Sequence, residues 1–211
     1  MNTHSFLAAY SAVVWLSAAL AISSPIMITD VESTCPLTPI RIGPLRTVTP
    51  EMTYTAIGDS ITAGSRPGTE PSWTVFFQAA HTTMYYNRAV WGYDTGRMLR
   101  KLRDEDIYTR TDVYFIHGGG NDIHGNQIRS PEIMCNIDEM VRLIEERGAI
   151  PVIVSPIPLN IHTSHYPELE AAIYREYRAS LHDYATERFI NFVDPWTAME
   201  DPFHPGLLNP R

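Results

Sequence analysis

The tripeptide Gly58-Asp59-Ser60 follows a short apolar run, Met52 to Ile57, and places a serine where a buried strand is expected to end. At the carboxyl end of a strand the serine hydroxyl faces the edge of the sheet, which is where open α/β sheets bind ligands. A serine hydroxyl is a weak nucleophile until a base removes its proton. Gly-Asp-Ser is also ordinary turn chemistry. The rest of the chain therefore has to supply a base, an orienting acid and donors for an oxyanion.

Three further sets of polar or small residues follow later predicted strands. Gly92 follows the second, Asn121 the third, and Asp201-x-x-His204 the fifth. Because all these loops open on the same edge of a parallel sheet, we expect them to converge with Ser60. A neutral imidazole acts as a base near physiological pH. A carboxylate three residues earlier on one tight loop can reach back to that imidazole.

The elements that must position these residues alternate between strand and helix. Apolar runs predict strands at Tyr54–Ile57, Thr83–Val90, Val113–His117, Val152–Val154 and Phe189–Val193. Apolar stripes at helical spacing predict helices around Trp73–Ala80 and Met98–Leu102, between Ser130 and Gly148, and after Pro167. Uniformly apolar strands that alternate with helices indicate a parallel sheet covered on both faces. We expect a three-layer α/β/α sandwich with a five-stranded parallel sheet.

The four blocks resemble those of the SGNH hydrolases, the GDSL esterase/lipase family, which is named for a Ser, a Gly, an Asn and a His. The resemblance runs from about residue 54 to residue 205. It implies an SGNH/flavodoxin-like fold with Ser60 as nucleophile, His204 as base and Asp201 as the acid that orients the imidazole. It also implies an oxyanion hole made by the backbone N–H groups of Ser60 and Gly92 and the side-chain amide of Asn121.

The implied function is a serine esterase that hydrolyses a carboxylic ester, acyl or acetyl, through an acyl-serine intermediate. An acyltransferase with the same triad and a non-catalytic carbohydrate-binding or surface-binding relative are the alternatives. The substrate is a small-molecule, glycan or lipid ester, and we expect no metal and no cofactor. Aromatic residues near the expected mouth either contact the substrate or pack in the core: Trp73, Trp91, Tyr93 and Phe203. The G-x-S-x-G elbow of α/β-hydrolases is absent around Ser60.

Several residues compete for these roles. His117 and His124 lie near Asn121 and are rival bases, although His117 ends a buried strand and is interpreted as a core or rim histidine. Asp194 is the rival orienting acid, but it lacks the three-residue spacing to a histidine. Two further acids are interpreted as structural: Asp59 orders the serine loop or caps the segment that follows it, and Asp122 holds the Asn121 loop by hydrogen bonds. A glycine at position 92 is favoured where a Cβ would block backbone approach.

The end of the chain departs from the family pattern. Only Pro205 to Arg211 follow His204, so the family's C-terminal helix is expected to be missing. Either the N-terminal arm covers that face of the sheet, or the domain is less stable. Pro202 stands where the family often has a small residue, which affects the predicted geometry between Asp201 and His204.

Composition sets the remaining limits. With 211 residues, of which 44% are hydrophobic, the chain fits one domain, expected at 52–211, preceded by a proline-containing arm at 23–51. Residues 1–22 are expected to be a signal peptide, or a signal anchor if the apolar run extends through residue 28, so the protein is predicted to be secreted or membrane-anchored. A net charge of −8 without a basic stripe argues against nucleic acid as a partner. Cys35 and Cys135 are either joined in one disulfide or remain as two unpaired thiols.

Overall fold

The computed structural model describes Leu37 and residues 45–64, 72–80, 84–104, 110–126, 130–158 and 167–200. The chain divides into the units Met1–Glu32 and Ser33–Arg211, and every described residue belongs to the second. The predicted leader, Cys35 and the Asp201-x-x-His204 segment, with the residues that follow it, lie outside the described residues. The predictions about them therefore stay predictions.

Five parallel strands form the centre of the domain. They are β1 (Tyr54–Gly58), β2 (Tyr85–Asn87), β3 (Val113–His117), β4 (Ile150–Val154) and β5 (Asn191–Val193). Their order is β2-β1-β3-β4-β5, and every neighbouring pair is parallel. This confirms the predicted parallel sheet, in the order typical of flavodoxin-like folds. In that order the winding of the chain reverses between β1 and β3, and the crevice beyond the carboxyl ends of these two strands is where such folds bind ligands.

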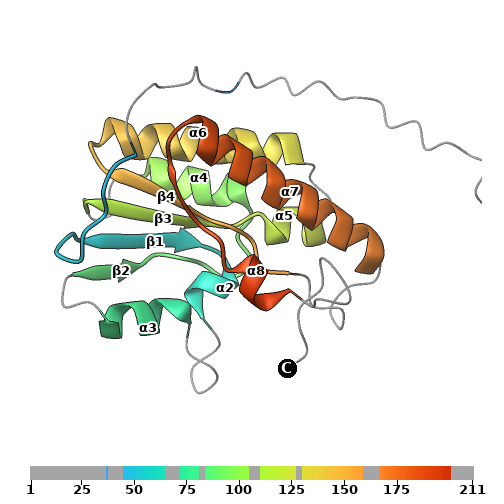
Figure 1. Cartoon of the computed structure of the whole chain (residues 1–211), viewed down its shortest axis with the longest axis horizontal. Coiled ribbons are helices and arrows are strands. Elements are labelled where there is room, and N and C mark those ends of the chain that lie inside the picture. Colours follow the sequence, from blue (N-terminus) through green and yellow to red (C-terminus); the bar gives the residue numbers. More distant parts are fainter. Residues whose placement is uncertain are drawn as a thin grey trace, which may run out of the picture. The chain divides into compact units, whose positions relative to one another are not determined.

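Helices cover both faces of the sheet (Figure 1). Their bounds are α2 (Ser60–Ala63), α3 (Trp73–Ala80), α4 (Thr95–Arg103), α5 (Gly120–Asn126), α6 (Ser130–Glu146), α7 (Pro167–Glu187) and α8 (Trp196–Met199). Successive side chains of a strand point to opposite faces. Ile57, Ile116 and Ile153 accordingly pack with α4, α6 and α7, whereas Phe115 and its neighbours on the other face pack with α3.

The last residues of the predicted N-terminal arm lie on this second face. Val48 and Met52 pack against the cluster that α3 covers. Arg46 donates hydrogen bonds of 2.7 and 3.0 Å to the carbonyl oxygens of Ala149 and Gly148, just before β4. These contacts fix residues 45–52 to the domain, and they supply part of the apolar cover over this face of the sheet.

The structure corrects several predicted boundaries. The second strand is shorter than the predicted Thr83–Val90, and the fifth begins at Asn191 because Phe189 has a φ of 56°, which no strand residue adopts. The loop predicted to follow Gly58 contains the one-turn helix α2. Helices α5 and α8 also lacked a prediction, because elements of four to seven residues are too short to show a helical apolar stripe.

Two properties of the described ranges bear on function. None of their helices is both long enough and apolar enough to cross a membrane. Within the same ranges, no three His, Cys, Asp or Glu side chains gather as potential ligands of a metal ion.

Candidate active site

The serine block forms a tight connection from β1 into α2. Gly58 is required there because an added Cβ would lie 2.5 Å from the carbonyl oxygen of His117 on the neighbouring strand. Asp59 caps the helix, and its Oδ1 accepts a 2.9 Å hydrogen bond from the N–H of Ile61. This confirms that Asp59 orders the serine loop. Ser60 is the first residue of α2, so its backbone N–H has no partner within the helix.

The asparagine block forms the first turn of α5, directly beyond β3. Asn121 donates from Nδ2 to the carbonyl oxygen of Tyr93 at 2.9 Å. A primary amide carries two N–H groups, so this bond orients Asn121 and leaves its second N–H for another acceptor. The buried carboxylate of Asp122 accepts from the N–H and the hydroxyl of Thr95, at 2.9 and 2.6 Å. The predicted structural role of Asp122 is thereby confirmed, and the bonds tie α5 to the start of α4.

Two tyrosines of α7 hold the glycine-rich turn before α5. The hydroxyl of Tyr177 donates to the carbonyl oxygen of Gly118 and that of Tyr174 to the carbonyl oxygen of Gly120, both at 3.1 Å. Gly119 has a φ of +100°, and a Cβ there would lie 2.4 Å from the Tyr177 ring. The turn is thus fixed from the side of α7. Nothing in the sequence signals these contacts, because the partners are more than fifty positions apart.

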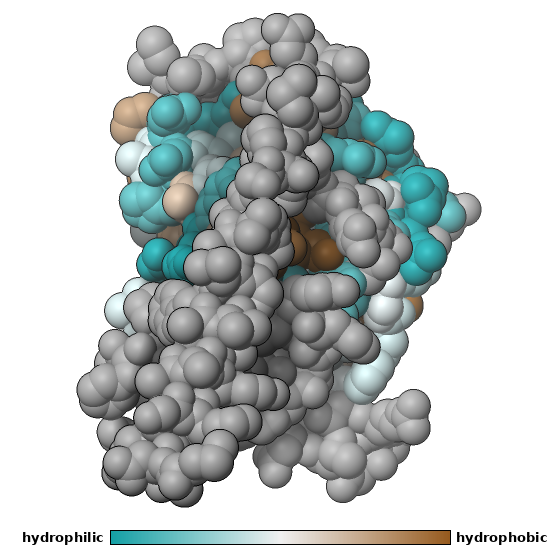
Figure 2. Space-filling view, turned by 90° about the vertical axis from the view of Figure 1, so that its right-hand side faces the viewer, coloured by the Kyte–Doolittle hydropathy of each residue, from teal (hydrophilic) through white to brown (hydrophobic). Residues whose placement is uncertain are grey.

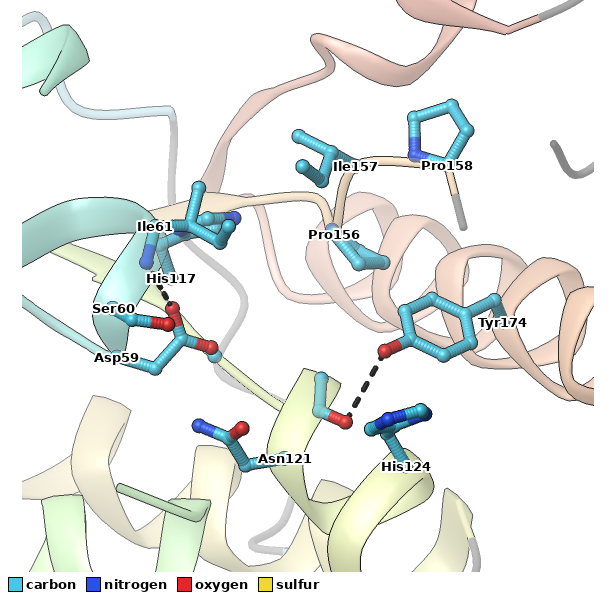
Figure 3. Close-up of a pocket in the computed structure, with 12 residues that line it drawn as sticks. Asp59, Ser60, Ile61, His117, Asn121, His124, Pro156, Ile157, Pro158 and Tyr174 are labelled. Atoms are coloured by element: carbon cyan, nitrogen blue, oxygen red, sulfur yellow. Dashed lines mark hydrogen bonds between the residues drawn. The ribbon is translucent and has the colours of Figure 1, made fainter. Parts of the chain in front are cut away.

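Ser60 and Asn121 line one cavity of about 180 Å³ at the carboxyl ends of β1 and β3 (Figure 3). The segment that follows β4 forms an apolar wall of the cavity with Pro156, Ile157 and Pro158. Sequence reasoning missed this segment, although the prediction that β4 ends at the same edge was the signal that could have found it. From the side toward which the strand arrows point, a small hydrophobic area is visible near the centre, with hydrophilic residues on both sides (Figure 2).

The rest of the lining contains Ile61, two glycines and several polar side chains. Helix α5 contributes His124 and α7 contributes Tyr174, which lie across the view of Figure 3 from Ser60. The ring of His124 is hydrogen-bonded through Nδ1 to Oε2 of Glu170 at 2.9 Å. The sequence identified His124 only as a rival base, and it gave no indication of its carboxylate partner.

Gly92 has a different place from Ser60 and Asn121. Gly92 does not line the cavity. It is connected to the site through the next residue, Tyr93, whose carbonyl oxygen accepts the hydrogen bond from the Asn121 amide. Gly92 lies in a turn closed by a 3.2 Å bond from the N–H of Tyr93 to the carbonyl oxygen of Val90. An added Cβ would meet no atom of the protein within 4 Å, so crowding within the protein does not require a glycine here. The reason is its φ of +71°, which strongly favours glycine at this position of a turn.

One of the four mouth aromatics proves to be a core residue. The ring of Trp73 packs edge-on against Phe115 and Phe77, with ring centroids 5.8 and 6.5 Å apart. Trp91 is half exposed, and Tyr93 packs at the margin of the main core. Phe203 lies outside the described residues. Core packing therefore accounts for Trp73, while Trp91 stays available at the surface.

A buried acid, Asp59, and a buried imidazole, His117, line the cavity together with the serine. The Nδ1 atom of His117 is 2.7 Å from the hydroxyl oxygen of Thr62, which confirms His117 as a hydrogen-bonded core histidine. Burial lowers the pKa of His117, and the neighbouring Asp59 opposes that shift. Burial also raises the pKa of Asp59, against the effects of His117 and of the N–H of Ile61. The neutral form of the imidazole is therefore favoured.

The carboxylate of Asp194, the rival orienting acid, contacts Arg178, Ser155 and Trp196. It forms an ion pair with Arg178 and accepts hydrogen bonds from Ser155 Oγ at 2.9 Å and from the N–H of Trp196 at 3.2 Å. Burial by itself would raise the pKa of Asp194, but the bonds from Arg178 and Ser155 outweigh it and the pKa is lowered. Asp194 thus joins β5, α7 and α8. Asp201 and His204 lie outside the described residues, so of the expected site the structure brings together Ser60 and Asn121.

Comparison with known proteins decides the family. The model of the GDSL-like lipase/acylhydrolase family matches residues 56–209, which is more than half of the chain. The chain belongs to this family. The resemblance seen in the four sequence blocks is thereby confirmed, and this GDSL-like protein is a hydrolase. No curated protein sequence matches it.

Solved structures of the same family share its fold. A GDSL-like lipase from Bacteroides thetaiotaomicron is 21% identical, with a TM-score of 0.61, and the match covers 78% of each chain. The lipase/acylhydrolase from Enterococcus faecalis is also 21% identical, with a TM-score of 0.58, over 73% of this chain and 80% of that one. AlinE4, an SGNH-hydrolase family esterase, is 19% identical, with a TM-score of 0.56, over 74% and 82%. At these identities the likeness is one of fold.

Proposed function

We propose that this GDSL-like hydrolase is a serine esterase that cleaves a carboxylic ester through an acyl-serine intermediate. The observation that carries the proposal is the meeting of Ser60 and Asn121 in one cavity, beyond the carboxyl ends of β1 and β3. This is the ligand crevice of a sheet with this strand order. An acyl substrate bound there has a hydroxyl nucleophile and an oriented amide donor within the same small space.

In this mechanism the Ser60 oxygen attacks the ester carbonyl and forms a tetrahedral oxyanion. His204 takes the Ser60 proton and delivers it to the departing alcohol, while Asp201 orients the imidazole. His204 then takes a proton from a water molecule that attacks the acyl-serine, the bond to Ser60 Oγ breaks, the carboxylic acid leaves, and His204 returns the proton to Ser60. His117 is a poor base for these steps because it is buried, its pKa is lowered and its Nδ1 is bonded to Thr62.

The oxyanion would accept hydrogen bonds from the second N–H of Asn121 and from the backbone N–H groups of Ser60 and Gly92. Two features support this part of the proposal. The Tyr93 carbonyl fixes the Asn121 amide, and Ser60 opens a helix, where backbone N–H groups lack intrahelical partners. Donors that are already oriented stabilise a developing charge without reorganising during the reaction.

The experiment is ester turnover with a covalent probe. Purified protein should hydrolyse p-nitrophenyl acetate and react with a fluorophosphonate, and Ser60→Ala should abolish both. Ser180→Ala, which removes a serine on α7 outside the cavity, is the matched control and should retain both. Wild-type protein that neither turns over short esters nor reacts with the probe would be a non-catalytic relative. Adding an acceptor alcohol during turnover separates hydrolysis from acyl transfer, because transfer yields a new ester.

We also propose that the enzyme acts outside the cytoplasm, as a secreted or membrane-anchored protein. The support is the uncharged apolar run at residues 6–22. Expression of the full chain followed by cell fractionation and determination of the mature N-terminus tests this. An intact N-terminus in the cytosolic fraction would contradict it.

A further inference from the structure

The pair His124–Glu170 is a polar feature of the cavity to which the proposed acyl-serine chemistry gives no role. His124 lies three residues after Asn121 on α5, and side chains at this spacing share a helix face. Glu170 lies four residues before Tyr174 on α7, again on one face. Two of these residues, His124 and Tyr174, line the cavity and lie across the view of Figure 3 from Ser60.

The bond between the two side chains determines what the imidazole offers. The Nδ1 atom of His124 is 2.9 Å from Oε2 of Glu170. Because an ionised carboxylate only accepts hydrogen bonds, Nδ1 must carry the proton in this contact. In a neutral ring the other nitrogen, Nε2, then has a lone pair and accepts a hydrogen bond. The Glu170 side chain is only 14% exposed and that of His124 is 39% exposed, so the carboxylate lies inside and the imidazole at the accessible side.

The charges near the cavity indicate what kind of ligand group suits this acceptor. The described residues that line the cavity include the carboxylate of Asp59 and contain no lysine and no arginine. Glu170 adds a second carboxylate directly behind the imidazole. An anionic ligand group would be repelled by both acids, and an ether or a methyl group has no proton to give. A neutral hydroxyl group satisfies the Nε2 acceptor without bringing charge into the cavity.

We propose that His124, held by Glu170, forms a subsite that binds a hydroxyl group in the alcohol part of the substrate, so that the enzyme prefers esters of polyhydroxylated alcohols such as glycerol or a sugar. The inference rests on the proposed esterase function. The apolar wall formed by Pro156, Ile157 and Pro158 suits the acyl group, which leaves the polar side chain of His124 for the alcohol. In this proposal His124 is a binding residue and Glu170 a positioning residue.

The test compares two esters that differ only in hydroxyl groups: glycerol monoacetate and the same ester with both free hydroxyls methylated. The readout is the ratio of their kcat/KM values. Loss of one neutral hydrogen bond should lower the ratio in His124→Ala about 3- to 10-fold, mainly through a higher KM for glycerol monoacetate. Glu170→Gln keeps an oxygen that can accept from Nδ1, so its ratio should fall less. His182→Ala removes an exposed histidine of α7 outside the cavity and should keep the wild-type ratio.

Three results would overturn the inference. The ratio could be the same in His124→Ala and wild type. Both esters could lose kcat equally, which would make His124 a catalytic base instead. Lastly, the wild type could favour a glycerol phosphate acetate over glycerol monoacetate, which would show an anion site.

Ligand-observed NMR can measure the binding of glycerol monoacetate to Ser60→Ala protein, which tests the subsite independently of turnover. A second substitution, His124→Ala, should weaken binding of glycerol monoacetate by the same factor, and equal binding by the single and double variants would refute the subsite. If wild-type protein turns over no ester while this difference in binding is present, the proposed reaction fails and the subsite stands.

Discussion

The contact between Asp122 and Thr95 allows the sharpest test of how the site is built. Both residues are fully buried, and the Asp122 carboxylate accepts from the N–H and the hydroxyl of Thr95 at 2.9 and 2.6 Å. The Thr95 hydroxyl oxygen in turn accepts from Asn136 at 3.0 Å. In Asp122→Ala the N–H and the hydroxyl proton of Thr95 lose their acceptor inside the protein. Each unsatisfied buried donor costs about 1–3 kcal/mol.

Two such donors set an upper range of about 2–6 kcal/mol for Asp122→Ala. Burial raises the pKa of Asp122, so the native state already bears a cost for holding this charge, and removing the carboxylate recovers part of it. We therefore expect the free energy of unfolding to fall by about 2–4 kcal/mol, with an unchanged denaturant m-value. Asn121 is the residue just before Asp122 on α5, so kcat for ester hydrolysis should fall as well.

Urea unfolding followed by circular dichroism measures the stability change. Asp183→Ala is the matched control, because it removes a carboxylate that is 75% exposed and should change stability by no more than about 0.5 kcal/mol. Unfolding of Asp122→Ala at the same urea concentration as Asp183→Ala would show that this contact does not stabilise the fold. Equal midpoints would mean that the donors of Thr95 find other partners once the carboxylate is gone.

Three further predictions concern the same edge of the sheet. Asn121→Ala removes the side-chain oxyanion donor and should lower kcat about 10²–10³-fold in a p-nitrophenyl acetate assay; a kcat within threefold of wild type would remove Asn121 from the mechanism. Gly92→Ala forces a φ of +71° on a residue with a Cβ that meets no other atom, so only backbone strain of about 1–2 kcal/mol should appear in urea unfolding. An unchanged midpoint would contradict the left-handed turn. His117 has its pKa lowered by burial from an ordinary 6.5, so the unfolded chain binds that proton more readily and stability should fall as pH drops below about 6.5. His117→Gln should flatten this part of the stability–pH profile, and parallel profiles for the two proteins would show that His117 is not the group responsible.

Elements with a long, regular apolar pattern can be predicted from the sequence. Very short elements, and contacts that depend on how helices pack on the sheet, cannot. The strand at Val113–His117 was predicted to the residue because both faces of a central parallel strand are buried, which gives an unbroken apolar run. Ser60 and Asn121 were placed at one edge for the same reason, since parallel strands end together. Helix α2 has a clear cap in Asp59, but four residues carry no periodic pattern. The strand expected from Phe189 starts at Asn191 because Phe189 has a positive φ. Amino-acid composition does not reveal such a backbone conformation, so the sequence could not predict the later start.

The walls of the cavity show where sequence reasoning ends. Tyr174 bonds a carbonyl oxygen 54 positions away, and the His124–Glu170 contact spans 46 positions. Both contacts depend on how α7 packs beside α5, which neither helix encodes by itself. Residue types at strand ends therefore predicted that Ser60 and Asn121 lie at one edge of the sheet. The residues that hold and surround them emerge only from the packing of helices on the sheet.

If Ser60 is the nucleophile, it is the residue that a covalent active-site probe must modify. Wild-type protein should be treated with a fluorophosphonate, digested and analysed by mass spectrometry. We expect a single adduct on Ser60, prevented by prior incubation with a substrate ester and absent in Ser60→Ala. An adduct on another serine, or turnover of short esters that persists in Ser60→Ala, would contradict this expectation.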